Sequence, residues 1–203
     1  ICSGTKTSYA VDNLSEINYE MNGNTSVGQT YEININIKNI KNLYGFSLDF
    51  TYDNSSMEIL EVSKGDIFNN TNAKVAINKK NNEQINFVVL LSGSSISINK
   101  SSGNLCKIKI KSLKPVTIKL NTISDNTRLD KLDRNIRIKL SNSSGNSIKY
   151  NSKVFEIIQS SSNKLIGWQY QDGKWYYYTS NGTKYKGWLD LNGKWYYLRN
   201  NGE

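Results

Sequence analysis

Most of the first 160 residues alternate between hydrophobic and polar positions with a period of two. In YEININIK, residues 31–38, Tyr and Ile side chains fall on one side of an extended chain and Glu, Asn and Lys on the other. This alternation is typical of a β-strand with one buried and one solvated face. The run INFVVLL is continuously apolar and is consistent with a strand covered on both sides. The alternating pattern recurs in GFSLDFTY, CKIKIKS, VTIKL and IRIKL.

Polar segments rich in Asn, Ser and Gly separate these runs, and no segment carries an apolar repeat of 3.6 residues for more than a couple of turns. The single proline, Pro115, lies between two expected strands, where its missing N–H does least harm. Many short strands joined by polar turns predict an all-β fold, a sandwich of two sheets. No apolar stretch reaches about 18 residues, so no membrane span is expected.

The last forty residues follow a different pattern, in which GWQYQDGKWYYYTSNG returns twenty residues later as GWLDLNGKWYYLRNNG. A fixed period predicts a repeat architecture whose units complete one another's cores. Each copy contains Asp-Gly or Asn-Gly followed by KWYY, and these dipeptides are the strongest short signal for a tight hairpin turn. The sequence therefore predicts two β-hairpins of 20 residues each, the beginning of a β-solenoid.

The composition narrows the chemistry that the chain can perform. Histidine is absent, which removes Ser-His-Asp and Cys-His catalysis and most transition-metal sites. Paired carboxylates remain as general acid and base, but the densest acidic stretch, SDNTRLDKLDR, is interleaved with Arg and Lys like a solvated loop. We expect no catalytic residue, no metal and no cofactor. The alternative is a hydrolase that uses a pair of carboxylates, either from Asp125, Asp130 and Asp133 of this stretch or Asp49 with Glu61 across strands.

The formal net charge is +9, but the positive residues are scattered singly along the expected strands instead of forming a run. We therefore expect no specific nucleic-acid binding, only a general attraction to anionic surfaces such as a cell wall.

The chain opens with ICSGTKTSYA, in which Ser8 and Ala10 are small residues three and one positions before a possible signal-peptidase cut. Residues 1–10 are interpreted as a leader remnant; an arbitrary boundary is the alternative. Cleavage there would remove Cys2 and leave Cys106 as a lone thiol, placed by the alternation on a buried face. The expected organisation is then a sandwich at 11–158, a linker at 159–164 and the repeats at 165–203.

The order of segments across about residues 17–158 resembles the cohesin domains of clostridial cellulosomes. The match includes VGQTYEININIKNIKNLYGFSLDFTYDNSSMEILEVSKGDIF, then INFVVLL, then a turn centred on Gly103 that leads into CKIKIKS. This resemblance implies a jelly-roll sandwich of about nine strands. It also implies a domain without catalysis that binds a calcium-loaded dockerin carried by enzymes.

In that family the dockerin is recognised on one flat sheet face, by polar residues of the strand that here ends at Tyr52-Asp53. The present sequence has Gly45 and Ser47 where an Asn and an Asp often stand, and Leu91 where an acidic residue often follows INFVVL. Together with Asp49 these residues are the expected partner-binding face. Because its hydrogen-bonding groups are fewer, a divergent dockerin, another protein, a glycan or an inert spacer role are alternatives.

The pattern GWxxxxGKWYYxxxxG resembles the choline-binding, or cell-wall-binding, repeats of Gram-positive surface proteins. Packing alone does not require indole at all four equivalent sites, and Trp is the best cation–π partner for a quaternary ammonium. The resemblance implies a cage made by both Trp of one hairpin and an aromatic residue of the next. The residues carried over are Trp168, Trp175 and Trp195, with Trp188 and Tyr197 as further candidates.

These patterns together predict a non-catalytic scaffold or anchoring protein, secreted and attached to the Gram-positive cell wall. Its sandwich binds a dockerin-bearing protein that degrades polysaccharide, while its repeats bind choline-substituted teichoic acid or another cell-wall glycan. The alternative is a carbohydrate-binding adhesion protein whose sandwich binds polysaccharide directly.

Overall fold

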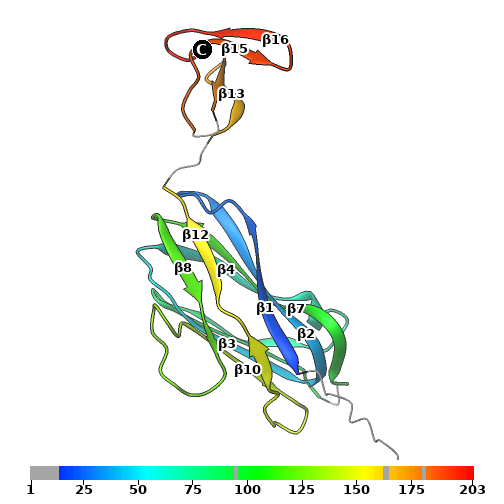
Figure 1. Cartoon of the computed structure of the whole chain (residues 1–203). Helices are drawn as coiled ribbons and strands as arrows, with labels where there is room; N and C mark the ends of the chain where they lie inside the picture. Colours follow the sequence, from blue (N-terminus) through cyan, green and yellow to red (C-terminus); the bar gives the residue numbers. More distant parts are fainter. Residues whose placement is uncertain (1–13, 94–95, 162–164, 180–181) are drawn as a thin grey trace, which may run out of the picture. The chain divides into compact units, whose positions relative to one another are not determined.

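The structure is a computed structural model that describes residues 14–93, 96–161, 165–179 and 182–203 (Figure 1). The expected leader remnant, with Cys2, and residues 162–164 of the expected linker lie outside the described residues. The chain divides into two compact units, residues 1–160 and 161–203. Each unit is described by itself.

One sheet of the first unit has the strand order β11-β1-β2-β7-β4, antiparallel except for the parallel pair β11 and β1. The YEININIK segment lies in its β2, and its Tyr and Ile side chains are buried as the alternation predicts. The five strands are β1 (Ser15–Gly23), β2 (Thr30–Leu43), β4 (Met57–Lys64), β7 (Ile98–Ser112) and β11 (Tyr150–Ser152).

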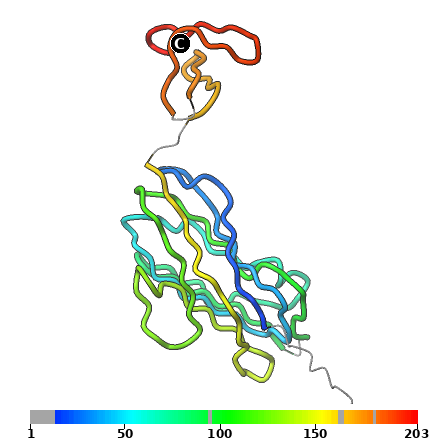
Figure 2. Tube along the Cα trace, in the orientation of Figure 1, coloured from blue at the N-terminus to red at the C-terminus, as the bar shows by residue number. Residues whose placement is uncertain are grey.

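The second sheet of the first unit has the order β5-β6-β3-β10-β9. Its strands are β3 (Gly45–Thr51), β5 (Lys74–Lys80), β6 (Gln84–Leu90), β9 (Thr122–Ile123) and β10 (Ile136–Ser141). The chain passes back and forth between layers, so strands far apart in sequence, such as β8 (Val116–Leu120) and β12 (Phe155–Gln159), lie side by side (Figure 2).

The sandwich predicted from the alternation is therefore confirmed, although it has twelve strands in its described part where about nine were expected. Two of them, β9 and β11, are only two and three residues long, too short for a period of two to reveal them. A single 3-10 turn, η1 (Asp66–Phe68), is the helical element of the described residues. No helix of that part is long and apolar enough to cross a bilayer.

The apolar run INFVVLL is not covered on both sides. In β6 the side chains alternate between the core and the outer face, so that Ile85, Phe87 and Val89 are buried and Leu90 is 41% exposed. Hydrophobic side chains such as Leu90 therefore remain exposed on the outer face of this sheet.

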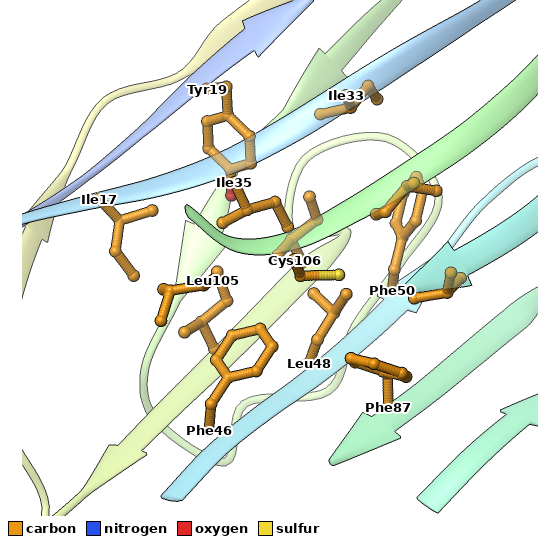
Figure 3. Packing of buried hydrophobic residues seen from close by; sticks show 14 of the residues in the cluster. Ile17, Tyr19, Ile33, Ile35, Phe46, Leu48, Phe50, Phe87, Leu105 and Cys106 are labelled. Carbon is orange, nitrogen blue, oxygen red and sulfur yellow. The ribbon is translucent and has the colours of Figure 1, made fainter. Parts of the chain in front are cut away.

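The core fills the space between the two sheets. Figure 3 shows Phe46, Leu48 and Phe87 of one sheet pointing toward Ile35 and Cys106 of the other. Cys106 is fully buried, as the alternation of its strand predicts, and this burial raises the pKa of its thiol. The thiol is therefore a small packing group of the core rather than a nucleophile.

Candidate functional site

The second unit consists of two antiparallel hairpins, as the repeat predicts. The first pairs β13 (Gly167–Gln171) with β14 (Lys174–Tyr178), and the second pairs β15 (Gly187–Leu191) with β16 (Lys194–Leu198). At both turns the two central residues, Asp172-Gly173 and Asn192-Gly193, have positive φ. Two successive residues of positive φ define the tight turn whose twist matches that of the flanking strands.

The ring of Trp168 is the centre of an aromatic cluster. It lies edge-on to Trp175 and Tyr177 of its own hairpin, with centroid distances of 6.3 and 5.4 Å. A third ring, Tyr196, comes from β16 of the second hairpin and lies 4.9 Å from Trp168 at an interplanar angle of 66°. Trp168 is half-buried, whereas Trp175 is 55% exposed. The two hairpins thus build one aromatic corner that is open to solvent at Trp175.

The second hairpin repeats the ring arrangement of the first. Trp188 lies 6.5 Å from Trp195 and 5.1 Å from Tyr197, and all three rings are largely exposed. The ring that the structure places against Trp168 is therefore Tyr196, whereas the expected third member, Trp195, lies against Trp188 within its own hairpin. The reason is strand alternation. Trp195 lies on the same face of β16 as Tyr197, and Tyr197 is paired directly with Trp188.

The repeat unit already contains one cation–π contact of its own. The ammonium of Lys184 lies 3.6 Å from the centroid of the Tyr176 ring and 5.9 Å from that of Tyr178. A charge held over an electron-rich ring is the same interaction that an aromatic cage offers to a quaternary ammonium.

An ion pair joins the two hairpins at their surface. Nζ of Lys174, at the start of β14, lies 2.8 Å from Oε2 of Glu203, which follows the second hairpin. Glu203 also lies 3.8 Å from Arg199. The hydrogen bond from Lys174 lowers the pKa of the Glu203 carboxyl, and the same contact raises the pKa of Lys174.

This ion pair predicts an acid-sensitive repeat unit. A carboxyl with a lowered pKa stabilises the fold above its unfolded pKa and loses this contribution as the pH falls through the folded pKa. A lysine with a raised pKa stabilises below its unfolded pKa and loses the contribution in alkali. The melting temperature of the unit, followed by Trp fluorescence, should therefore be level between about pH 5 and 10 and decline below. Glu203→Gln should shrink the acid decline; an unchanged decline would contradict the assignment.

On the sandwich, the outer face of the second sheet presents rows of side chains that cross its strands. Lys79, Asn86, Asp49 and Arg137 stand opposite one another in one such row. Asp49 accepts a hydrogen bond from Nδ2 of Asn86 at 2.5 Å and lies 3.3 Å from Nη1 of Arg137. The carboxylate of Asp49 is thus already paired with one side chain on each neighbouring strand.

Two rows farther along the same face, beyond the row of Ser47 and Val88, Gly45 stands directly opposite Leu90. A Cβ at Gly45 would come within 2.5 Å of Oγ of Ser141 and 2.9 Å of a methyl carbon of Leu90, so these two side chains fill the space above it. Gly45 is itself buried and offers no side chain to a partner. Ser47, two residues on, is half-buried on the outer face.

The expectation for Leu91 is corrected by its position. Its side chain is 4% exposed and belongs to the hydrophobic core, because it continues the alternation of β6 in phase with Phe87 and Val89. Leu90 takes its place on the outer face of the sheet.

A family model described as cohesin domain matches residues 21–145, more than half of the chain. The chain belongs to the cohesin domain family. A second model, described as choline-binding repeat, matches residues 165–203. No curated protein matches the chain.

Solved cohesins share the fold of this cohesin domain. A type II cohesin domain from the cellulosome of Acetivibrio cellulolyticus has a TM-score of 0.54 at 21% identity, covering 72% of this chain and 95% of its own. A type I cohesin–dockerin complex from Clostridium thermocellum gives 0.54 at 15% identity, covering 77% and 100%. The cohesin module of a Clostridium perfringens family 33 glycoside hydrolase gives 0.51 at 14%, covering 73% and 98%.

The acidic stretch of the cohesin domain forms turns. Asp130 accepts hydrogen bonds from the backbone N–H groups of Asp133, Leu132 and Arg134, which lower its pKa to about 2. No group of three potential metal-binding side chains occurs among the described residues. Asp49 and Glu61 do not face each other, because Asp49 lies on the outer face of the second sheet and Glu61 is an exposed residue of β4 in the first sheet.

Two residues of these surfaces were missed from the sequence. Tyr196 was not among the expected ligand-binding residues, yet the alternation of KWYY places it on the face opposite Trp195, the face that meets the preceding hairpin. Leu90 was hidden within an apolar run that was interpreted as fully covered. In both cases a strict period of two was the signal that distinguishes the faces.

Proposed function

We propose that the protein is a non-catalytic scaffold of the cell surface, whose cohesin domain binds a dockerin-bearing partner while its repeats bind choline of the wall. Cohesin domains are non-catalytic binding modules, and residues 165–203 match a choline-binding repeat. One observation supports the assignment of different ligands to the cohesin domain and to the repeats. Every exposed aromatic side chain of the described residues lies in the repeat unit, and the exposed hydrophobic side chains of the described sandwich are aliphatic.

This distribution favours a protein partner for the sandwich. Sugar-binding faces use exposed aromatic rings as stacking platforms, and the outer face of the second sheet has none among its described residues. It offers Leu90 and Ile77 beside charged rows, the mixture of apolar and polar groups found in protein–protein interfaces. Several structural relatives were solved as complexes with dockerins, including two from Clostridium thermocellum.

The ring geometry of the repeats favours a cation over a sugar. The contacts of Trp168 with Trp175, Tyr177 and Tyr196 have interplanar angles of 88°, 74° and 66°. Steeply inclined rings form a corner that surrounds a compact cation, whereas a sugar ring stacks best on a flat platform. Choline-substituted teichoic acid is therefore the proposed wall ligand, and export to the cell surface is part of the same proposal.

The proposal is tested by capture on the outer face of the sandwich. The full chain is immobilised with its repeats saturated by free choline and exposed to purified dockerin modules of both types. At least one dockerin should bind, and Leu90→Lys should weaken it about tenfold or more, because a charge would enter the buried centre of the interface.

Leu60→Lys is the matched control, because Leu60 has nearly the same exposure, 40%, and lies in β4 of the other sheet. It should leave the affinity within about twofold. Retention of polysaccharide in affinity electrophoresis, lost in Leu90→Lys and without any dockerin binding, would contradict the proposal and support a carbohydrate-binding sandwich.

A further inference from the structure

A groove of about 1160 Å³ lies at the polar end of the outer face of the second sheet. One wall is formed by residues 78–86, where β5 turns into β6, and the other by residues 128–134, which precede β10. The second wall is held against the sheet by Arg137, whose guanidinium donates to the backbone oxygens of Asp125 and Thr127 at 2.8 and 2.6 Å. Lys131 joins the walls through an ion pair with Glu83 at 2.5 Å. The groove is thus built by specific contacts between distant segments.

The lining carries six positive and three negative side chains. Each carboxylate already has a partner inside the groove; the pairs are Asp49 with Arg137, Glu83 with Lys131 and Asp130 with Arg134. Of the remaining cations, Lys80 donates to the backbone oxygen of Ile59 at 2.7 Å.

Lys79 and Arg128 are left, one on each wall, and the side chain of neither has a hydrogen bond or ion pair with any residue that the structure describes. The groove therefore holds two uncompensated positive charges that face the same space.

The groove is continuous with an apolar strip on the same face. Ile77 stands opposite Val88 across β5 and β6, two residues along the strand from the row of Lys79 and Asn86, and Leu90 follows Val88. A partner that fills the groove with negative groups would at the same time cover this strip with apolar ones.

We infer that the groove receives acidic side chains of the protein that docks on this face, with Lys79 and Arg128 as the residues that select them. This inference rests on the proposed function and names the chemistry of its partner. A guanidinium binds a carboxylate through two parallel hydrogen bonds, and the ammonium of Lys79 adds a point charge from the opposite wall. The adjoining aliphatic strip matches a protein surface rather than an anionic polysaccharide, which has no apolar side chains to cover it.

The test titrates the full chain, labelled with nitrogen-15, with an octamer of glutamate at low salt. Amide shifts should be confined to residues 78–86 and 128–137 and should weaken as salt is added. The double variant Lys79→Glu/Arg128→Glu should raise the Kd about tenfold or more. Lys100→Glu/Lys149→Glu changes the net charge equally at exposed positions on and beside the first sheet, and it should bind as the wild type does.

Shifts that are absent, scattered over the surface or equally reduced by both double variants would overturn the inference, as would tighter binding of an oligogalacturonate in the groove. The result is separable from the proposed function. If a dockerin binds Lys79→Glu/Arg128→Glu as tightly as the wild type, the inference about the groove is contradicted, whereas the proposed scaffold role is not affected. If no dockerin binds at all, the scaffold role fails, and the glutamate titration still decides on the groove.

Discussion

Replacing Trp168 by alanine is expected to weaken choline binding at the junction of the two hairpins by about tenfold or more. Its ring contacts Trp175 and Tyr177 of its own hairpin and Tyr196 of the next. Its loss therefore removes the central ring of the aromatic corner and the contact between the two hairpins there. A cation–π contact contributes about 0.5–2 kcal/mol, which alone corresponds to about a twofold to thirtyfold loss. Because the separation of the remaining rings adds to this loss, a decrease in affinity of about tenfold or more is expected. Isothermal calorimetry with choline chloride measures it.

Trp188→Ala is the matched control, because it removes the equivalent indole of the second hairpin and leaves the Trp168 corner complete. It should retain choline binding at that corner. Tyr196→Leu should weaken binding while keeping an apolar side chain between the hairpins. Wild-type affinity in both Trp168→Ala and Tyr196→Leu, with circular dichroism confirming the fold, would refute the assignment of the corner.

Phe87→Ala is expected to cost the sandwich about 3–5 kcal/mol of its free energy of unfolding. Phe87 is fully buried on the inner face of β6, and its removal leaves a cavity that a core packed from two rigid sheets cannot close. Urea unfolding followed by far-ultraviolet circular dichroism measures the loss. Leu132→Ala, at a side chain that is 77% exposed, should change the stability by less than about 0.5 kcal/mol. Equal losses in the two variants would show that burial at Phe87 is not what stabilises the sandwich.

All four tryptophans lie in the repeat unit, which allows its unfolding to be followed apart from that of the sandwich. Trp fluorescence should therefore keep its wild-type transition in Phe87→Ala while circular dichroism shifts. In the choline experiments, a change in Trp fluorescence therefore reports on the hairpins and not on the sandwich.

Local patterns were sufficient for the elements of this protein. The alternation in residues 31–38 and the Asp172-Gly173 and Asn192-Gly193 turns act over a few residues, and they placed strands and hairpins correctly. Local patterns could not predict contacts between side chains that come from distant segments of the chain. The contact of Tyr196 with Trp168 depends on how one hairpin stacks on the next, and the groove depends on Arg137 holding residues 125–127 against β10. Leu91 was misplaced although its burial continues the alternation of Ile85, Phe87 and Val89, because the expected role came from the resemblance and not from the period of two.

The free borders of the two sheets have a consequence for how copies of this chain behave in solution. Each border strand is either two or three residues long, as in β9 and β11, or is interrupted by a bulge, as in β4 and β5. β5 also carries three lysines. Short, kinked or charged margins discourage backbone pairing between molecules and so oppose aggregation. A chain displayed at high density on a surface would thereby remain separate from its neighbours, available to bind through side chains instead of by strand addition.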